Sequence, residues 1–304
     1  MSILIIFIVI LVCVMMITLL ERKYLGYLQR RVGRVYWGKF GILQRVADGL
    51  KLYVKEVLLS VLVLGVLYSL TRIIFIMISI VIYSVLPVYN LTENCIVVYR
   101  SNYSIIIIFI VSSLSSYSIL FSGLSSNNMY SIIGSLRCIS QLISYEVYIG
   151  IILIIILLLC YYGNIGQILS ISNLYRIQVE YSVIIGFIVI FVIYIISIIG
   201  ETNRSRLDIS EAESELVSGW NTEYSAISFA AFMIGEYSII IVLSYLTSII
   251  FFKTEVLVLS SATLGIIFTF ILSRGTLPRL KQDQLLILGW KYILIIVLAY
   301  VCII

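Results

Sequence analysis

The chain has 304 residues, of which 62 % are hydrophobic and 12 % are charged; its formal net charge is +5 and its mean hydropathy is +1.16. A soluble domain carries about 25 % charged residues, so this composition excludes a soluble globular protein. Long apolar runs such as residues 149–160 lack the alternation of barrel strands, and we therefore expect an all-α polytopic membrane protein.

Eight apolar segments approach or exceed the roughly 20 residues that a helix needs to cross a bilayer. The first has no basic segment before it and no small-residue cleavage site before Glu21, so we interpret it as a permanent helix. We expect one membrane-embedded domain over residues 1–304. Its spans are expected at about 2–20, 72–89, 102–122, 131–160, 181–200, 224–252, 255–273 and 284–304.

Between the first two spans, residues 40–56 repeat apolar side chains at helical spacing and place Arg45, Asp48 and Lys51 on the other faces. This pattern predicts an amphipathic helix in the membrane interface. Such a helix either roofs a cavity in the protein or rests on lipid, and the pattern fits both.

The basic residues indicate the topology. Fourteen of the 20 lie in the loops after spans 1, 3, 5 and 7, three lie in the opposite loops, and Arg72, Arg137 and Lys291 lie within spans. By the positive-inside rule, this split places both termini outside. It also places the polar stretches 21–56, 201–223 and 274–283 together on the inner face.

Three charges fall deep within the fourth and sixth spans: Arg137, Glu146 and Glu236. Acidic residues at membrane depth are costly and often mark ion or proton pathways. The alternative is that each charge pairs with a neighbouring helix for structural reasons. Arg137 and Glu146 are about 13 Å apart along a helix axis, so we expect no direct pair within their own helix.

An acidic stretch precedes the sixth span. Residues 209–224 contain four of the 15 acidic residues of the chain: Glu211, Glu213, Glu215 and Glu223. Such a stretch is often a solvated face, but the interleaved Trp220 favours partial burial. Crowded, partly buried carboxylates titrate as a coupled group, so this one is a candidate proton-exchanging cluster.

Several kinds of chemistry lack their residues. The chain has no histidine, its five cysteines are scattered, and it contains neither GxGxxG nor a Walker-type loop. Haem, common zinc sites, iron–sulfur clusters and nucleotide phosphates are therefore not expected in this chain. If the protein serves redox chemistry, a partner holds the cofactors; we expect no nucleic-acid partner.

Five collinear segments carry a family resemblance. They are ERKYLGYLQRRVG (21–33), FGILQRVADGLKLYVKE (40–56), SNNMYSIIGSLRCISQLISYE (126–146), ETNRSRLDISEAESELVSGWNTEY (201–224) and RGTLPRLKQDQLLILGWK (274–291). Together they cover somewhat under half of the chain. In this order they resemble the subunit 1 family of respiratory complex I, the proton-pumping NADH:ubiquinone oxidoreductase.

The resemblance implies a function for the whole chain. A subunit of this family forms the quinone-access tunnel and the start of the acidic proton path, and anchors the redox arm to the membrane arm. Ubiquinone is the substrate, while FMN and iron–sulfur clusters are held by partner subunits and this chain holds no cofactor. The implied location is the mitochondrial inner membrane, with a bacterial plasma membrane as second choice.

The resemblance also implies roles for individual residues. The quinone tunnel would include Glu21, Arg22, Lys23, Arg31 and Asp48. The proton path would include Glu146, Glu201, Glu211, Glu213, Glu215, Glu223 and Glu236. The interface with the redox arm would include Arg274, Arg279 and Asp283.

The chain departs from the family at turns. The family usually has proline at the positions of Arg34, Lys39, Arg45, Val57 and Arg206. Proline fixes φ, so we expect altered loop paths at these positions. Four of the five replacements are basic, and we expect them to face an acidic partner or anionic lipid such as cardiolipin.

Three other interpretations remain open from the sequence. A cation/proton secondary transporter would use Glu146 and Glu236 as ion sites, although it predicts internal repeats that we do not find. The related subunit of a membrane-bound hydrogenase shares the same motifs. A purely structural anchor predicts that Glu→Gln changes leave activity unaltered.

Overall fold

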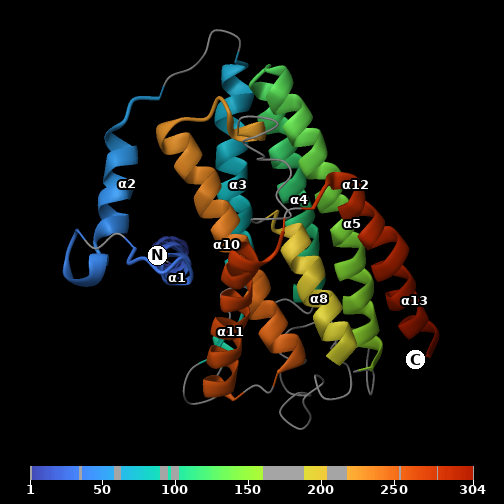
Figure 1. The fold of residues 1–304 in the computed structure, drawn as a ribbon. Coiled ribbons are helices and arrows are strands. Elements are labelled where there is room, and N and C mark those ends of the chain that lie inside the picture. The colour runs from blue at the N-terminus through green and yellow to red at the C-terminus, as the bar shows by residue number, and fades with distance from the viewer. Residues whose placement is uncertain are drawn as a thin grey trace.

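The computed structural model describes residues 2–33, 36–57, 63–89, 95–96, 103–159, 188–203, 218–252, 255–278 and 280–303. Helices dominate these residues (Figure 1). The long helices are α1 (Ser2–Leu28), α3 (Gly65–Val85), α4 (Ser104–Ser125), α5 (Met129–Leu159), α8 (Ile188–Glu201), α10 (Ala226–Phe251) and α11 (Val256–Thr276). The last helix joins α12 (Gln282–Ile287), a π-helical turn (Leu288–Ile293) and α13 (Leu294–Ile303).

The helices have the length and apolar composition that membrane spans require. Seven of them in the described residues are long and apolar enough to cross a bilayer, with mean hydropathies from 2.0 to 2.6, and α8 is a shorter apolar helix. The expected all-α polytopic fold is therefore confirmed. The remaining regular structure described is small: two two-residue strands, β1 (Val88–Tyr89) and β2 (Cys95–Ile96), pair antiparallel.

Two helix boundaries differ from expectation. Helix α1 continues to Leu28 instead of ending at residue 20, and α3 starts at Gly65 instead of residue 72. In α1 the charged residues that suggested a loop are accommodated inside the helix, because Glu21 receives hydrogen bonds from other helices. In α3 the apolar residues before Arg72 extend the helix, so that this arginine lies in its second turn.

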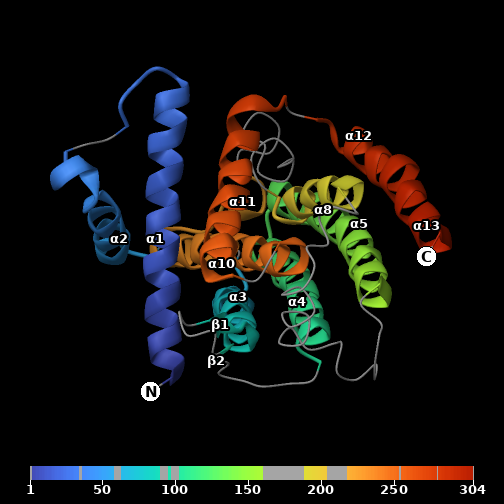
Figure 2. The ribbon, with the colours of Figure 1, turned by 90° about the horizontal axis from the view of Figure 1, so that it is seen from below.

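The helices form a broad bundle with α10 near its centre. Helices α3, α4 and α5 pack side by side, α10 packs on α3 and α11, and α8 packs on α5. Figures 1 and 2 place α1 with α2 at one edge and α12–α13 at the other. Figure 2 also shows that α10 runs across α1 instead of alongside it.

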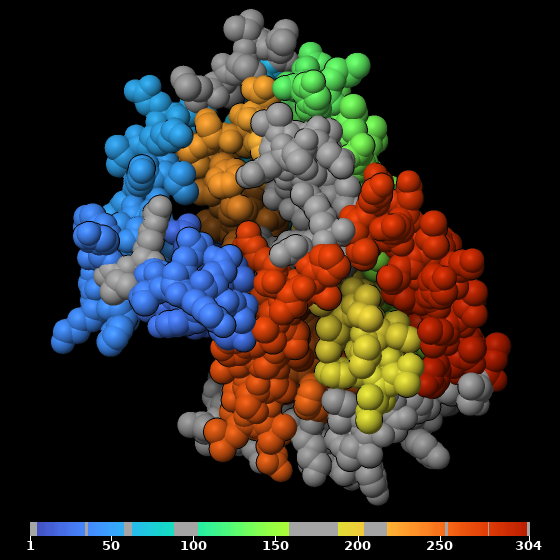
Figure 3. Space-filling model, in the orientation of Figure 1, coloured from blue at the N-terminus to red at the C-terminus, as the bar shows by residue number. Residues whose placement is uncertain are grey.

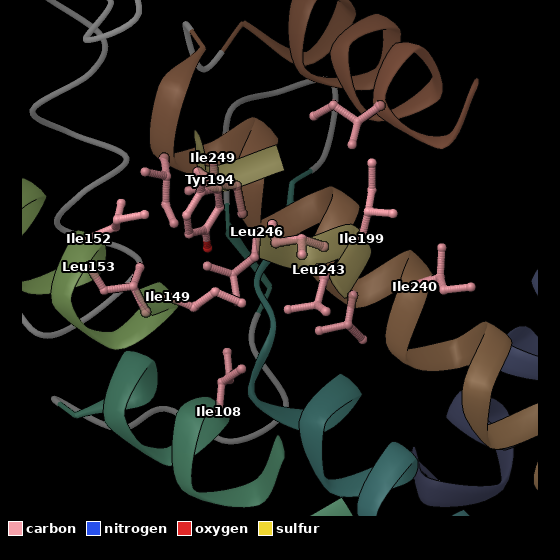
Figure 4. Packing of buried hydrophobic residues seen from close by; sticks show 14 of the residues in the cluster. Ile108, Ile149, Ile152, Leu153, Tyr194, Ile199, Ile240, Leu243, Leu246 and Ile249 are labelled. Atoms are coloured by element: carbon pink, nitrogen blue, oxygen red, sulfur yellow. The ribbon is translucent and has the colours of Figure 1, made fainter. Parts of the chain in front are cut away.

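Branched aliphatic side chains fill the interior. Figure 4 shows Ile149 and Ile152 of α5 facing Leu243 and Leu246 of α10, with Tyr194 of α8 among them. Dispersion contacts between such side chains stabilise helix packing where no water is present.

A glycine allows the closest helix approach. A Cβ atom on Gly235 of α10 would lie 2.2 Å from the ring of Phe75 of α3. Only a hydrogen at this position allows the two helices to pack at their present separation.

The amphipathic segment forms a short helix. A 3-10 turn at Lys39–Gly41 leads into α2 (Gln44–Val54), within the expected range of residues 40–56. The apolar side chains of Leu50 and Tyr53 are exposed, so they are available to lipid. Asp48, Gly49 and Leu52 line a cavity in the protein. The helix therefore has one face for each of the two roles left open by the sequence.

Candidate functional site

A large cavity lies where α10 runs across α1. Its volume is about 1340 Å³, and it is bounded by α1, α2, α10 and the end of α11. Figure 3 shows the surface hollowed between the blue residues of α1–α2 and the orange residues of α10. Its apolar lining includes Leu11, Val14, Met15, Phe229, Met233 and Ile234, and its polar lining includes Glu21, Arg22, Arg31, Arg45, Asp48, Lys51, Glu236, Tyr237 and Arg274.

Glu21 lies buried on one wall of this cavity. Its two carboxylate oxygens accept separate hydrogen bonds, one from the hydroxyl of Tyr237 on α10 and one from the guanidinium of Arg274 on α11. The glutamate side chain is 7 % exposed. A buried carboxylate is costly unless it is paired and hydrogen-bonded, and this arrangement satisfies both needs while joining three helices.

The next two residues of α1 point elsewhere. Arg22 forms an ion pair with Asp48 of α2 at 2.8 Å, and the ammonium of Lys23 lies 5.8 Å from the ring centre of Phe40. Arg31 follows the helix and lines the large cavity with an exposed side chain. Of the expected tunnel residues, only Lys23 does not line this cavity.

Asp48 and Arg45 hold α2 against α1. Burial alone would raise the pKa of Asp48, but the hydrogen bond from Gln44 and the charge of Arg22 together lower it below the usual value. Asp48 is therefore ionised at neutral pH. The guanidinium of Arg45 donates to the backbone carbonyl of Thr18 in α1, and burial lowers the pKa of this arginine. One replacement of the usual family proline thus faces α1, not an acidic partner or lipid.

A second, smaller cavity lies between α4, α5, α8 and α10, and we call it the acidic cavity. Its lining includes the carboxylates of Glu146, Glu201 and Glu236. Its volume is about 40 Å³, room for a few water molecules by the measure in which one needs about 10–15 Å³. Hydroxyl groups of α4 line it as well: Ser112, Ser115 and Ser116.

Two carboxylates of the acidic cavity have unsatisfied oxygens. Within the described part of the chain, neither Oε1 of Glu146 nor Oε2 of Glu201 accepts a hydrogen bond. Buried polar atoms are nearly always hydrogen-bonded, and exceptions often mark strained or functional positions. Glu146 and Glu201 are therefore the candidates in this site for exchanging a proton.

The two cavities share a wall. Glu236 and Asn203 line the large cavity and also the acidic cavity. Glu236 directly precedes Tyr237, which hydrogen-bonds Glu21 on the large-cavity side. The fold thus brings Glu21, Glu236 and Glu146 into one sequence of polar groups that starts at the large cavity and ends in the acidic one.

Other expected residues lie elsewhere. Glu223 accepts a hydrogen bond from the side chain of Asn128 at 3.2 Å and lines neither cavity. Asp283 lies exposed in the first turn of α12. Glu211, Glu213, Glu215 and Arg279 fall outside the described residues.

Trp220 has the burial that the sequence suggested. Its side chain is 1 % exposed and packs edge-on against Tyr224 and Phe232. Tyr224 is buried beside it and hydrogen-bonds the hydroxyl of Ser125 at 3.0 Å; burial raises the pKa of this tyrosine. The end of the acidic stretch is therefore part of the packed protein, not a solvated loop.

Sequence reasoning missed two residues of the site, Tyr237 and Asn203. Tyrosine is common in this chain, with 23 copies, so nothing singled out Tyr237. Asn203 belongs to the ETNR motif but carries no charge. Among the described residues, no group of three or more His, Cys, Asp or Glu side chains could hold a metal ion.

The fold and the site define a class: polytopic α-helical membrane proteins with a large amphipathic cavity beside a buried acidic one. The family model described as NADH dehydrogenase matches residues 1–304. NADH-ubiquinone oxidoreductase chain 1 of Chondrus crispus is 40 % identical, over 96 % of this chain and 90 % of the relative. An NADH-quinone oxidoreductase subunit of Magnetococcus marinus is 38 % identical, over 97 % and 87 %. The chain therefore belongs to the NADH dehydrogenase family.

A third relative agrees with these two. NADH-ubiquinone oxidoreductase chain 1 of Paracentrotus lividus is 34 % identical, over 96 % of this chain and 90 % of the relative. These matches confirm the resemblance drawn from the five motifs. With the apolar helices, they also support a multi-pass inner-membrane protein, and they favour the oxidoreductase interpretation over a separate transporter.

Proposed function

We propose that this chain is the membrane subunit of a proton-pumping NADH:ubiquinone oxidoreductase. In this proposal the large cavity admits ubiquinone, and the acidic cavity begins the proton path. The observation that carries the proposal is the wall that both cavities share at Glu236 and Asn203. Through this wall, a change of charge in the large cavity acts directly on groups in the acidic one.

The composition of the large cavity suits a quinone. Its volume exceeds the roughly 300–1,000 Å³ of usual small-molecule sites. Apolar side chains of α1 and α10 suit an isoprenoid tail, and the polar groups near Asp48 and Arg22 suit a carbonyl-bearing ring. We assign Glu21, Arg22, Arg31 and Asp48 to this tunnel and place Lys23 beside its mouth.

The proton path would begin at the shared wall. We propose that Glu236, Glu201 and Glu146 pass the proton, supplied by the acidic stretch that includes Glu211, Glu213, Glu215 and Glu223. A unit charge about 8 Å away contributes roughly 2 kcal/mol at an effective dielectric of about 20. This energy is enough to move a proton between carboxylates of similar proton affinity, so quinone reduction can drive the first transfer.

The remaining partners follow from the proposed complex. FMN and the iron–sulfur clusters would belong to other subunits, in keeping with a chain that contains no histidine. We propose that Arg279 and Asp283 face the redox arm, and that Arg274 contributes through the end of α11. Anionic lipid such as cardiolipin would contact the exposed cations of the inner face, and the complex would lie in the mitochondrial inner membrane.

The first experiment uses detergent-solubilised native membranes. On a native gel, we expect this chain to co-migrate with an NADH-oxidising band that contains flavin and iron–sulfur signals. The band should reduce ubiquinone, and an inhibitor that competes with quinone should block that reaction.

Two other outcomes would contradict the proposal in different ways. A flavin-containing band that evolves hydrogen would indicate the hydrogenase-type complex. Migration of the chain in a small particle without redox cofactors would support an independent secondary transporter.

A further inference from the structure

Lys291 is a charged residue well inside the last apolar helix. The segment Gln282–Cys302 has a mean hydropathy of 2.3. At 1.5 Å per residue, Lys291 lies about 13 Å along the axis from the start of α12. An ammonium at such depth is costly in lipid and calls for a partner or an escape to the interface.

The other charges deep in the described spans are at least partly covered by protein. Arg72, Arg137, Glu146 and Glu236 are all partly buried in the bundle, whereas the side chain of Lys291 is exposed. Within the described residues, Lys291 takes part in no hydrogen bond and no ion pair. Its counter-charge must therefore come from outside these residues.

The local backbone turns Lys291 outward. Residues Leu288–Ile293 form a π-helical turn, in which one extra residue widens the helix. Gly289 packs on the hydroxyl of Tyr148, because a Cβ atom there would lie 2.6 Å from that oxygen. The ring of Trp290 packs edge-on against Tyr148 at 6.1 Å, and Trp290, Lys291 and Tyr292 are all exposed. The turn thus presents three consecutive large side chains away from α5.

The helix itself lies at the edge of the bundle. Its described contacts are mainly with α5, and Figure 2 shows α12–α13 at the outer edge, opposite α1. Only 22 % of this span is buried, the smallest share among the seven long spans. We call its exposed surface the Lys291 face; its members are Ile287, Trp290, Lys291, Tyr292, Ile295 and Leu298.

We propose that the Lys291 face is the docking surface for a transmembrane helix of a partner subunit, and that this helix carries a carboxylate at the depth of Lys291. The apolar members suit lipid and protein equally, so the lysine decides between them. A carboxylate neutralises the ammonium at that depth and is itself neutralised by it. The inference rests on the proposed function only in requiring a multisubunit complex.

The competing arrangement is a lysine that extends along the helix to lipid phosphates. Lysine has a long apolar stem, and side chains on a helix lean toward its N-terminus, which here is the inner face. The two arrangements predict opposite effects when the charge is removed. A lipid-facing helix gains apolar character, whereas a docked helix leaves its partner carboxylate buried and unpaired.

The first test is zero-length cross-linking of the assembled complex with an apolar carbodiimide. The reagent activates a carboxylate, the amine of Lys291 displaces it to form an amide, and the carbodiimide leaves as a urea that carries the lost water. We expect mass spectrometry to find Lys291 joined to a carboxylate within an apolar segment of another subunit. Recovery of Lys291 uncoupled, or joined only to an aqueous loop, would overturn the proposal.

The second test compares Lys291→Met with Lys291→Arg on native gels. Breaking a buried ion pair by removing one partner is strongly destabilising, so we expect Lys291→Met to reduce the assembled complex at least about tenfold. Lys291→Arg should assemble like wild type, as should the control Lys281→Met, whose exposed lysine precedes the same helix. Full assembly of Lys291→Met would contradict the proposal and leave the NADH:quinone assignment untouched.

Discussion

Glu236 of α10 and Glu146 of α5 line the same small cavity, although they belong to helices that are distant in sequence. Glu236 also lines the large cavity. An acid that borders both a substrate-sized space and a buried acidic one can couple events in the two. Coupling between the cavities therefore depends on Glu236 and on the side chains around it.

The first prediction concerns the hydrogen bond from Tyr237 to Glu21. Tyr237→Phe removes a donor to a buried carboxylate, and hydrogen bonds to charged groups contribute about 1.5–3 kcal/mol. We expect a loss of about 2 kcal/mol in the stability of the α1–α10 contact. Thermal unfolding of the purified complex measures it. Tyr117→Phe, at an exposed tyrosine of α4, is the control, and an equal loss in that variant would contradict the assignment.

The second prediction concerns pH and α2. The pKa of Asp48 is lowered in the folded protein, so its ion pair with Arg22 stabilises the docked helix above the unfolded-state pKa of about 3.9. This contribution is lost as pH falls through the folded-state pKa. Docking should therefore be independent of this group between about pH 5 and 8 and should weaken below about pH 4.

Limited proteolysis within residues 36–57 across this pH range measures the docking of α2. In Asp48→Asn, cleavage should already be fast at neutral pH and should lose the acid-dependent step. An acid step of wild-type size in this variant would show that another group is responsible.

The third prediction concerns access to the large cavity. Ala230→Phe adds a ring to its lining on α10, and we expect the KM for long-tailed ubiquinone to rise about tenfold, equivalent to about 1.4 kcal/mol. A short-chain quinone should be less affected. Ala262→Phe on α11, outside both cavities, should leave both KM values near wild type. Equal effects of the two variants would argue against a quinone in this cavity.

The fourth prediction concerns helix packing. Gly235→Ala places a methyl group against Phe75, and overpacking of this kind costs about 1–3 kcal/mol. We expect a lower melting temperature of the assembled complex. Gly265→Ala is the matched control, because nothing lies within 4 Å of its Cβ position. Identical melting temperatures for the two variants would contradict the close α3–α10 contact.

Much of the fold could be predicted from hydrophobicity, because lipid leaves the backbone few alternatives to a helix. Residues 2–28 show the limit of this approach. Glu21, Arg22 and Lys23 look like the start of a loop, yet the helix continues through them. Their partners lie on α2, α10 and α11 and in the 3-10 turn before α2, and a local pattern contains no information about such distant contacts.

The candidate site could be predicted in part for a similar reason. Glu146 and Glu236 stood out because a carboxylate within an apolar run is costly and therefore rare. Their meeting in one cavity depends on how α5 and α10 pack, which neither apolar run specifies. Tyr237 gave no signal, since its role arises only from its position opposite Glu21.

The most direct test of the central claim is proton translocation by the complex carrying Glu146→Gln, reconstituted in vesicles with ubiquinone and NADH. We expect the rate of proton translocation to fall at least about tenfold, since removal of a proton-transferring group commonly costs about 10²–10⁴ in rate. Glu255→Gln, at an exposed glutamate before α11, should translocate protons like wild type. Unchanged translocation by Glu146→Gln in a fully assembled complex would contradict the proposed proton path.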